Sequence, residues 1–285
     1  MISLAQTAPG RFLVKAQRSY LWRNGYFRRR KYAEKMADIA CQPQNWAPPV
    51  NAVVYSYVNE HDVPEQVVSL RSFLRFVGVP SEFVVVSDGT LTQKSKEIIE
   101  SNHPCVRCSD GHELEKALGE EFLAPFRRVL EGNLFWRKFQ VIAFLTQRDG
   151  VGVYADSDIL FFPGAQKNGG NFCQYAPGNL WYLPDIPNET EGGKYYDGPL
   201  IAHESEREKA TNAGFGVFAK RADWSKVAQR VETYEQEANF FTEQTLVHLM
   251  MRFNEANPLD PQRHVLTFSD VETWGDEVHR REDVV

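Results

Sequence analysis

Two aspartates separated by one residue, Asp156 and Asp158, directly follow the apolar run 151–155. A short apolar run of this kind predicts a buried strand, and side chains two positions apart in a strand point to the same side. We therefore expect both carboxylates to face one site. Paired carboxylates supply the hard oxygen ligands that Mg²⁺ and Mn²⁺ prefer, and these ions complete their shell with water and substrate phosphates. The pair predicts a metal site that also holds a phosphate-containing ligand.

The residues around this pair bear on a second interpretation, in which two surface acids merely cap a turn. A strand pattern precedes the pair and the apolar run 159–162 follows it, which favours the metal site. Leu160 and Phe161 occupy positions where a calcium loop requires an oxygen ligand and a glycine, so that class of site is excluded. A departing nucleoside diphosphate gains negative charge and needs such an ion. Ser157, between the two acids, is placed to contact the ribose or a phosphate of such a ligand.

The segments around the pair alternate between strand and helix patterns. Before it, we expect strands over 51–58, 81–87, 104–108 and 151–155, and helices over 63–77, 91–101, 113–130 and 134–148. This alternation is typical of an α/β domain with a parallel sheet, where ligands gather at the carboxyl ends of the strands. After it, we expect a loop region with short strands over 163–199, a strand over 212–219, and helices over 224–237 and 242–253.

Four stretches in this order carry a resemblance to a known family: F-W-R-K-F-Q-V-I-A-F-L, V-Y-A-D-S-D-I-L-F-F, N-A-G-F-G-V-F and T-E-Q-T-L. Their order and spacing resemble the motif series of GT-A fold nucleotide-diphospho-sugar glycosyltransferases, over about residues 51–255. The resemblance implies an α/β fold with a Rossmann-like, mixed but mostly parallel sheet flanked by helices. It also implies transfer of a sugar from a UDP- or GDP-sugar to a glycan or other hydroxyl acceptor, with Mn²⁺ or Mg²⁺ as the cofactor.

The resemblance further implies roles for particular residues on the donor side. Asp156 and Asp158 would bind the cation. The end of the first strand would hold the base and ribose, through Ser56, Tyr57, Val58 and Asn59, with Asp88 as a further nucleoside contact. A cation on the helix before the aspartates would meet the donor phosphates, and Lys138 matches that position better than Arg137, because adjacent residues do not share one helix face.

On the sugar side, the resemblance points to the segment 212–214 and to the start of the last helix. Asn212, Ala213 and Gly214 would touch the transferred sugar. Glu243 and Gln244 match an acidic residue and a glutamine of the family, and Glu243 would act as a general base or orient the sugar. A third metal ligand is expected from a histidine near the end of the domain, and His264 is the best placed candidate.

Two other functions remain as alternatives. A phosphatase of the haloacid dehalogenase type also places two aspartates after an apolar strand, the first as nucleophile. That motif normally opens its domain, whereas here a strand–helix–strand unit precedes it. A second alternative is a relative of the glycosyltransferases that binds a nucleotide or glycan without turnover, although both metal acids are retained.

Residues 1–50 differ in charge from the rest of the chain and are expected to form a basic, aromatic-rich extension of a catalytic domain over 51–285. They carry nine Lys or Arg against two acids, whereas the remainder carries 23 against 36, so that the formal net charges are +7 and −13. This composition suits an anionic membrane surface, or a helix that packs its aromatic residues on the body. Nucleic-acid binding is not expected. In the absence of a signal-peptide pattern we expect a cytoplasmic protein, with any membrane contact at the inner face.

Overall fold

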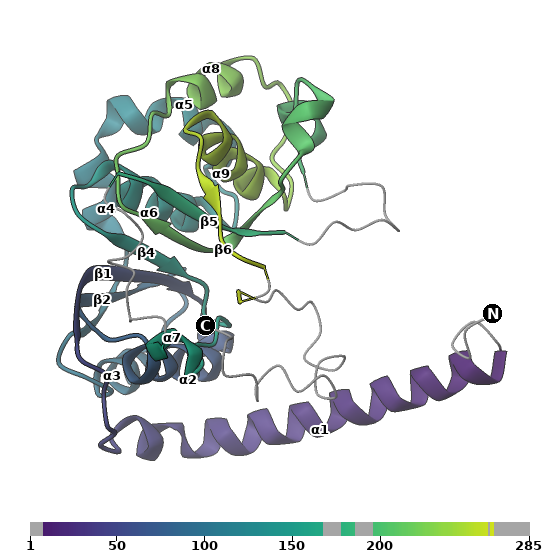
Figure 1. Ribbon diagram of the computed structural model, residues 1–285, viewed down its shortest axis with the longest axis vertical. Coiled ribbons are helices and arrows are strands. Elements are labelled where there is room, and N and C mark those ends of the chain that lie inside the picture. Colours follow the sequence, from purple (N-terminus) through teal and green to yellow (C-terminus); the bar gives the residue numbers. More distant parts are fainter. Residues whose placement is uncertain (1–7, 168–177, 186–195, 262, 265–285) are drawn as a thin grey trace.

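A seven-stranded mixed sheet forms the centre of the molecule (Figure 1). The computed structural model describes residues 8–167, 178–185, 196–261 and 263–264. The strands run in the order β3-β2-β1-β4-β6-β5-β7. Their bounds are β1 Pro49–Val58, β2 Val79–Ser87, β3 Val106–Ser109, β4 Gly152–Ala155, β5 Leu180–Pro184, β6 Thr211–Phe218 and β7 Asn257–Pro258. Strand β6 runs antiparallel to β4 and β5, and the other pairs are parallel.

Helices cover both faces of this sheet (Figure 1). Their bounds are α1 Ala8–Ala40, α2 Val63–Phe76, α3 Gln93–Glu100, α4 His112–Leu118, α5 Glu120–Leu130, α6 Trp136–Gln147, α7 Gly164–Lys167, α8 Ser225–Glu232 and α9 Thr242–Phe253. Helices α4, α5, α6, α8 and α9 lie on one face, and α2, α3 and α7 lie on the other. The sheet therefore separates two hydrophobic cores, as expected for an α/β domain.

Alternation along the strands decides which side chain enters which core. In β1, Tyr55 belongs to the core under α6 and α9, whereas Val54 belongs to the core under α2 and α3. In β4, Tyr154 and Val153 are divided in the same way. Because the parity continues to the strand end, the residue after Ala155 points toward α6. The α6 side of the sheet is thus the side on which the predicted site begins.

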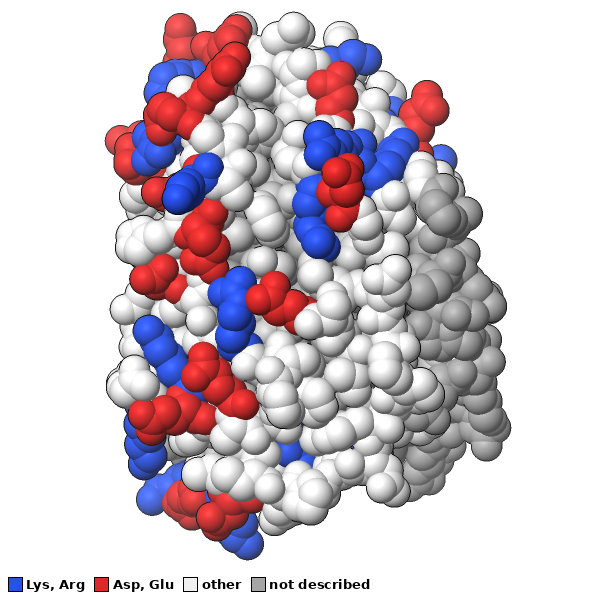
Figure 2. Space-filling view, turned by 90° about the vertical axis from the view of Figure 1, so that its left-hand side faces the viewer, with Lys and Arg blue, Asp and Glu red and all other residues white. Residues whose placement is uncertain are grey.

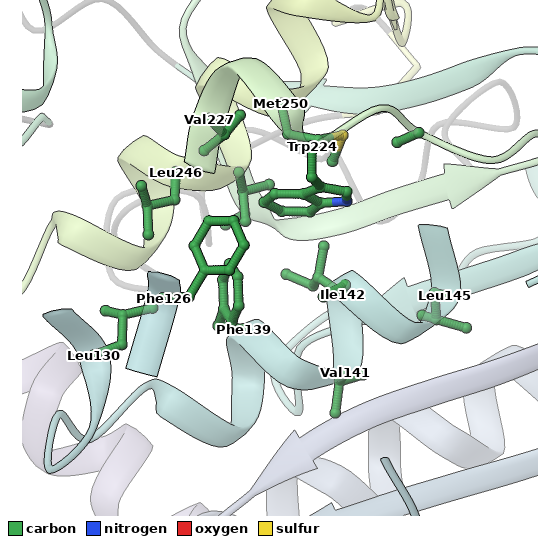
Figure 3. Packing of buried hydrophobic residues seen from close by; sticks show 14 of the residues in the cluster. Phe126, Leu130, Phe139, Val141, Ile142, Leu145, Trp224, Val227, Leu246 and Met250 are labelled. Carbon is green, nitrogen blue, oxygen red and sulfur yellow. The ribbon is translucent and has the colours of Figure 1, made fainter. Parts of the chain in front are cut away.

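The core on the α6 side is dominated by aromatic rings (Figure 3). Phe126 of α5, Phe139 of α6 and Trp224 at the start of α8 form a mutual cluster, with ring centroids 4.8–5.6 Å apart. Aromatic pairs at such separations contribute roughly 0.5–1.5 kcal/mol each beyond the area that they bury. This cluster fixes α6 against α5 and α8, so that the first turn of α6 has a defined position.

Most of the predicted elements are confirmed, and two predicted helices are wrong in extent. The segment 113–130 forms two helices, because Gly119 between them has φ of +77°, a conformation that favours glycine. The helix predicted over 224–237 ends at Glu232, and the following residues form a loop. Helix α9 has the predicted bounds. In the predicted loop region, the described residues include α7 and β5.

Helix α1 runs past the body, and only its carboxyl-terminal part contacts α2 and α3 (Figure 1). Met36 and Ala40 are buried there. The guanidinium of Arg29 forms an ion pair with Glu65 of α2, with Nε 2.5 Å from Oε1. The guanidinium of Arg71 donates to the carbonyl oxygen of Ala40 at 3.1 Å. Among the residues that the structure describes, no helix has the length and apolarity needed to cross a membrane.

Candidate functional site

Strand β4 places Asp156 directly after its last residue, at the carboxyl end of the central strands. The amide of Ile159 donates to the carbonyl oxygen of Asp156 at 3.1 Å, so residues 156–159 form a turn. Strand alternation therefore does not extend to Asp158, and our reason for placing the two carboxylates together was wrong. Asp158 is exposed within the turn, and Ser157 is half-buried beside it.

Lys138 of α6 is the closest described cation to Asp156. Its ammonium Nζ lies 2.9 Å from Asp156 Oδ2, and the lysine is buried although it carries a charge. Burial alone would lower the pKa of Lys138, but the carboxylates of Asp156, Glu243 and Asp158 outweigh it and raise the pKa. Lys138 is thus protonated and lies among three acids.

Two further contacts fix the orientation of the Asp156 carboxylate. The hydroxyl of Tyr154 donates to Oδ1, which leaves each carboxylate oxygen with one protein donor. The amide of Asp156 donates to the carbonyl oxygen of Gly214 on the neighbouring strand β6 at 2.8 Å. Tyr154 was not among the predicted site residues, although its position two residues before Asp156 in the strand could have indicated it.

The predicted segment 212–214 lies against this carboxylate. A β-carbon at Gly214 would lie 2.7 Å from Asn212 Oδ1 and 3.1 Å from Asp156 Oδ2, so only glycine fits without displacement. Asn212 Oδ1 accepts from the amide of Gly214 at 2.8 Å. The side chain of Ala213 packs in the α6-side core, so Ala213 has only its backbone to offer to a ligand.

Glu243, in the first turn of α9, is buried on the same side of the sheet. Burial raises its pKa to about 7, with Lys138 lowering and Asp156 raising the value. Its Oε1 has no hydrogen-bond partner in the described structure. The amide of the adjacent Gln244 donates to Asp185 Oδ2 at 3.2 Å, and Asp185 follows β5. Asp185 was not predicted, because it lies alone in a segment without a motif.

Two of the residues predicted at the end of β1 have side chains in the core. The hydroxyl of Ser56 is fully buried and donates to Gln66 of α2. Val58 belongs to the core under α2. Both point away from the α6 side, as even-numbered residues of β1 must. The predicted contacts of Ser56 and Val58 with a donor would therefore be made by their backbone.

The other two residues at this strand end are differently placed. Tyr57 points to the α6 side, and its hydroxyl donates to the carbonyl oxygen of Leu134 at 2.7 Å. Burial raises the pKa of Tyr57 to about 12. Asn59 caps the short helix Glu60–Asp62, where its Oδ1 accepts from the amide of Asp62 at 3.0 Å. Tyr57 thus faces the site, whereas Asn59 is engaged in a local turn.

A second cation lies at the end of β2. Arg137, adjacent to Lys138, donates through Nη1 to the carbonyl oxygen of Ser87 at 2.9 Å, and its guanidinium lies beside Gly89. Asp88 is beside it, and its amide donates to the carbonyl oxygen of Val58 at 3.0 Å. Within the described residues Arg137 has no ion-pair partner. The two cations face different strand ends, so Arg137 also lies near the candidate site.

The charges around Asp156 bear on whether Asp156 and Asp158 fit a metal ion. Asp156, Asp158 and Glu243 act electrostatically on Lys138, so that the acids outnumber the cation. A diphosphate would add negative charge to this cluster, and a divalent ion offsets that excess, so the two aspartates fit the predicted role. Among the described residues, however, no three His, Cys, Asp or Glu side chains gather closely enough to hold a metal.

His264 was predicted as the third ligand, and the structure does not bring it into such a group with the two aspartates. Its Nδ1 lies 3.1 Å from the carbonyl oxygen of Asp260, and burial lowers its pKa. The two aspartates lie in the turn after β4, whereas His264 lies in the segment after β7. Water and ligand phosphates would therefore supply the remaining metal ligands.

Comparisons with known proteins bear on the fold. No protein-family model matches the chain, and no curated protein matches its sequence. The chain is similar to the structure of the galactosyltransferase LgtC in complex with donor and acceptor sugar analogues, with a TM-score of 0.51 and 12% identity, over 82% of this chain and 84% of that one. An active-site mutant of LgtC gives a TM-score of 0.51 and 14% identity over the same shares. The chain therefore has the GT-A fold, and the predicted fold class is confirmed.

Proposed function

We propose that the protein is a glycosyltransferase that moves a sugar from a nucleotide-diphosphate sugar to a hydroxyl group of an acceptor. The observation that carries this proposal is the buried cluster of Asp156, Lys138 and Glu243 at the carboxyl end of β4, on a GT-A fold. In open α/β sheets, ligands bind at the carboxyl ends of the strands, and this is where the cluster lies. The similar LgtC structure was obtained with donor and acceptor sugar analogues.

The nucleotide would lie at the ends of β1 and β2. Tyr57 and Arg137 both reach this edge, one with a half-buried phenol and the other with a guanidinium beside Gly89. A guanidinium binds phosphate through two parallel N–H donors, and it also stacks on flat ring systems. Arg137 therefore supplies the donor contact that Ser56 and Val58 cannot supply through their side chains. Asp88, which follows β2 at this edge, is the candidate for a contact with a ribose hydroxyl.

The diphosphate would lie over the turn 156–159. Asp156 and Asp158 would hold Mn²⁺ or Mg²⁺, which supplies Lewis-acid stabilisation of the leaving diphosphate. Tyr154 and Lys138 hold the Asp156 carboxylate in one orientation before any ligand binds. Lys138 also places a positive charge close to the departing phosphate, and such preorganised charge is usually the largest catalytic contribution. Ser157 remains a candidate for a phosphate or ribose contact.

The sugar would lie between the turn after β4, strand β6 and the start of α9. In the transfer, the bond from the anomeric carbon to the phosphate oxygen breaks and a bond to the acceptor oxygen forms. The acceptor hydroxyl loses its proton in that step. Glu243, with a pKa of about 7, exchanges a proton readily at neutral pH and is the described residue best suited to receive it or to orient the sugar. Asn212, Gly214 and Gln244 would line this place.

The phosphatase alternative is not favoured by this arrangement. The solved structures to which the chain is similar are glycosyltransferases rather than phosphatases. The aspartates also follow the fourth strand of the sheet rather than the first. A relative that binds nucleotide or glycan without turnover keeps the same contacts, and only a measurement of turnover separates it from an enzyme.

Thermal unfolding of the purified chain with UDP-sugars, GDP-sugars and sugar phosphates, each with and without Mn²⁺, tests the proposal. A ligand at about 100 times its Kd stabilises the folded state by about 2.7 kcal/mol, so one nucleotide series should raise the Tm only when Mn²⁺ is present. Release of the nucleoside diphosphate, measured over time, then shows turnover. If no nucleotide raises the Tm and a phosphate ester is hydrolysed, the phosphatase is the correct function.

The variant Asp158→Ala isolates the metal site. Asp158 is exposed in a turn, so its removal should leave the Tm without ligand nearly unchanged and abolish the increase that depends on Mn²⁺. Asp149→Ala is the matched control, since Asp149 is also exposed and lies before β4, where it pairs with Arg221 at 3.1 Å. An Mn²⁺-dependent increase that persists in Asp158→Ala contradicts the assignment of the metal site.

A further inference from the structure

A cleft of about 600 Å³ lies outside the cluster described above. One wall is formed by residues within 128–134, at the end of α5 and in the loop that follows it. Residues 234–238, in the loop between α8 and α9, form the other wall. Clefts that bind small ligands commonly measure roughly 300–1,000 Å³, so this one is large enough for such a ligand. No part of the donor arrangement proposed above occupies it.

Both walls of the cleft are bonded to residues of the candidate site. The carbonyl oxygen of Leu134 accepts the hydroxyl of Tyr57 at 2.7 Å, at the end of β1. On the other wall, the hydroxyl of Tyr234 donates to Asp197 Oδ2 at 2.6 Å. That same oxygen accepts the hydroxyl of Thr242, the residue before Glu243, at 2.5 Å. A molecule in the cleft would therefore lie beside the end of β1, where we place the nucleotide, and beside the start of α9, where we place the sugar.

Exposed apolar side chains lie at and beside the cleft: Leu134 lines it, and Phe240 follows the wall 234–238 by two residues. Leu134 is 66% exposed and Phe240 is 68% exposed, and they are among the few large hydrophobic side chains in the described chain that face solvent to this extent. The ring of Phe240 packs edge-to-face on Phe135, with centroids 5.2 Å apart, and the Lys138 ammonium lies 6.0 Å from the Phe135 centroid. Exposed apolar groups that gather beside a site mark a binding surface.

The interior of the cleft is polar and acidic. Its charged groups are Glu131, Glu235 and Glu237 against the single cation Arg128, and Arg128 donates to the backbone of Val231. Carboxylates repel an anionic ligand, whereas they accept hydrogen bonds from hydroxyl groups. A ligand with apolar ring faces and many hydroxyl groups matches both the edge and the interior. The negative charge of an anionic lipid or a phosphorylated acceptor does not match the acidic interior.

We infer that this cleft binds a neutral oligosaccharide, which is the part of the acceptor that extends beyond the sugar carrying the reacting hydroxyl. The inference rests on the proposed function, because it assigns an acceptor to the same reaction. It adds the class of that acceptor and the surface that recognises it. Phe240 stacks on a sugar ring, and the glutamates of the loop 234–238 accept hydrogen bonds from its hydroxyl groups.

Binding to a panel of immobilised oligosaccharides tests the inference. The panel contains neutral trisaccharides, such as maltotriose, cellotriose and chitotriose, together with sulfated and phosphorylated trisaccharides, and fluorescently labelled full-length protein is the probe. The wild type should retain at least one neutral glycan and no anionic one. The variants Phe240→Ala and Glu235→Gln/Glu237→Gln should bind that glycan at least tenfold more weakly. Phe27→Ala is the control, because Phe27 is 56% exposed on α1.

Nucleotide-sugar binding by the same variants separates this inference from the proposed function. Phe240→Ala should keep the Mn²⁺-dependent increase in Tm with the nucleotide sugar, because Phe240 lies outside the donor arrangement. If the wild type binds nucleotide sugar but no neutral glycan, or if Phe240→Ala binds the glycan as well as the wild type, the cleft assignment is overturned and the proposed function stands. If the glycan binds in the cleft but no nucleotide sugar binds, the proposed function fails instead.

Discussion

At the scale of single residues, the site depends on a balance of charge around Lys138. The buried ammonium of Lys138 forms an ion pair with Asp156 and interacts electrostatically with Asp158 and Glu243 at longer range. Ion pairs of this kind contribute little net stability compared with apolar packing, but removal of one partner leaves a charge without compensation. Each member of the cluster is therefore needed to compensate the charges of the others. This explains how a buried lysine can persist in a core that is otherwise aromatic.

Lys138→Met should destabilise the folded state by about 3 kcal/mol, because it leaves the Asp156 carboxylate with Tyr154 as its remaining protein donor. Urea unfolding at neutral pH measures this change. Lys94→Met is the control, since Lys94 is exposed on α3, and it should change stability by less than about 0.5 kcal/mol. A loss below about 1 kcal/mol in Lys138→Met shows that the ion pair does not hold the site together.

Gly214→Ala should weaken binding of the nucleotide sugar with Mn²⁺ by at least roughly tenfold, equal to about 1.4 kcal/mol. The added β-carbon would lie 2.7 Å from Asn212 Oδ1 and 3.1 Å from Asp156 Oδ2, so both side chains must move. Gly198→Ala is the matched control, because a β-carbon there meets no atom within 4 Å. Titration calorimetry measures both variants. Equal affinity in Gly214→Ala would show that the Asp156 orientation is not needed.

At the scale of elements, the sequence predicted helices and strands that depend on a regular apolar period, and it did not predict the breaks and turns that depend on single residues. Helix α9 has the expected bounds because its apolar period is regular, whereas the break at Gly119 rests on one glycine with positive φ. The turn that carries Asp158 was also not predicted, because we extended the alternation of strand side chains past the end of the strand. The position of Arg137 was also not predicted. The sequence analysis chose between Arg137 and Lys138 for one phosphate contact, whereas in the structure Arg137 bonds to the end of β2 and Lys138 bonds to Asp156 after β4.

Helix α9 also carries a buried histidine, His248, that makes stability depend on pH. Its Nε2 lies 2.6 Å from the carbonyl oxygen of Glu206 and its Nδ1 lies 3.2 Å from Thr211 Oγ1. Burial is the main cause that lowers its pKa, with Arg252 adding to it and Glu206 opposing it. The folded state therefore binds fewer protons than the unfolded state below about pH 6.5. The contribution of His248 to stability is complete above that pH and is lost as the pH falls toward the folded pKa, whereas the raised pKa of Glu243 acts in the opposite direction.

His248→Gln should accordingly remove the contribution that the wild type loses as the pH falls below about 6.5, which amounts to up to about 1.4 kcal/mol per pH unit. Urea unfolding at a series of pH values measures the slope for each protein. His61→Gln is the control, because the His61 side chain is 78% exposed, and it should keep the wild-type slope. The same slope in His248→Gln and the wild type would show that His248 is not the group that titrates.

At the scale of the whole molecule, charge is divided between the helix α1 segment and the body. Residues 1–50 have a formal net charge of +7, from nine basic residues and two acids, and the remainder has −13. On the face that Figure 2 shows, Lys and Arg side chains are interspersed with Asp and Glu. Part of α1 extends past the body (Figure 1), and Tyr26 and Phe27 are about half exposed on it, at 52% and 56%. The basic charge is thus presented together with aromatic side chains.

This arrangement leads us to expect that the full-length protein sediments with phosphatidylcholine vesicles containing phosphatidylglycerol and not with phosphatidylcholine alone. Each basic residue near an anionic surface contributes about 1 kcal/mol, and the attraction falls with added salt. The variant Arg28→Glu/Arg30→Glu/Lys31→Glu should abolish sedimentation, because these side chains are exposed on α1. The control Lys94→Glu/Lys116→Glu/Lys226→Glu changes the net charge equally on the body and should sediment like the wild type. If both variants lose binding alike, net charge rather than α1 determines the attraction. If neither does, the attraction does not come from these basic residues of α1.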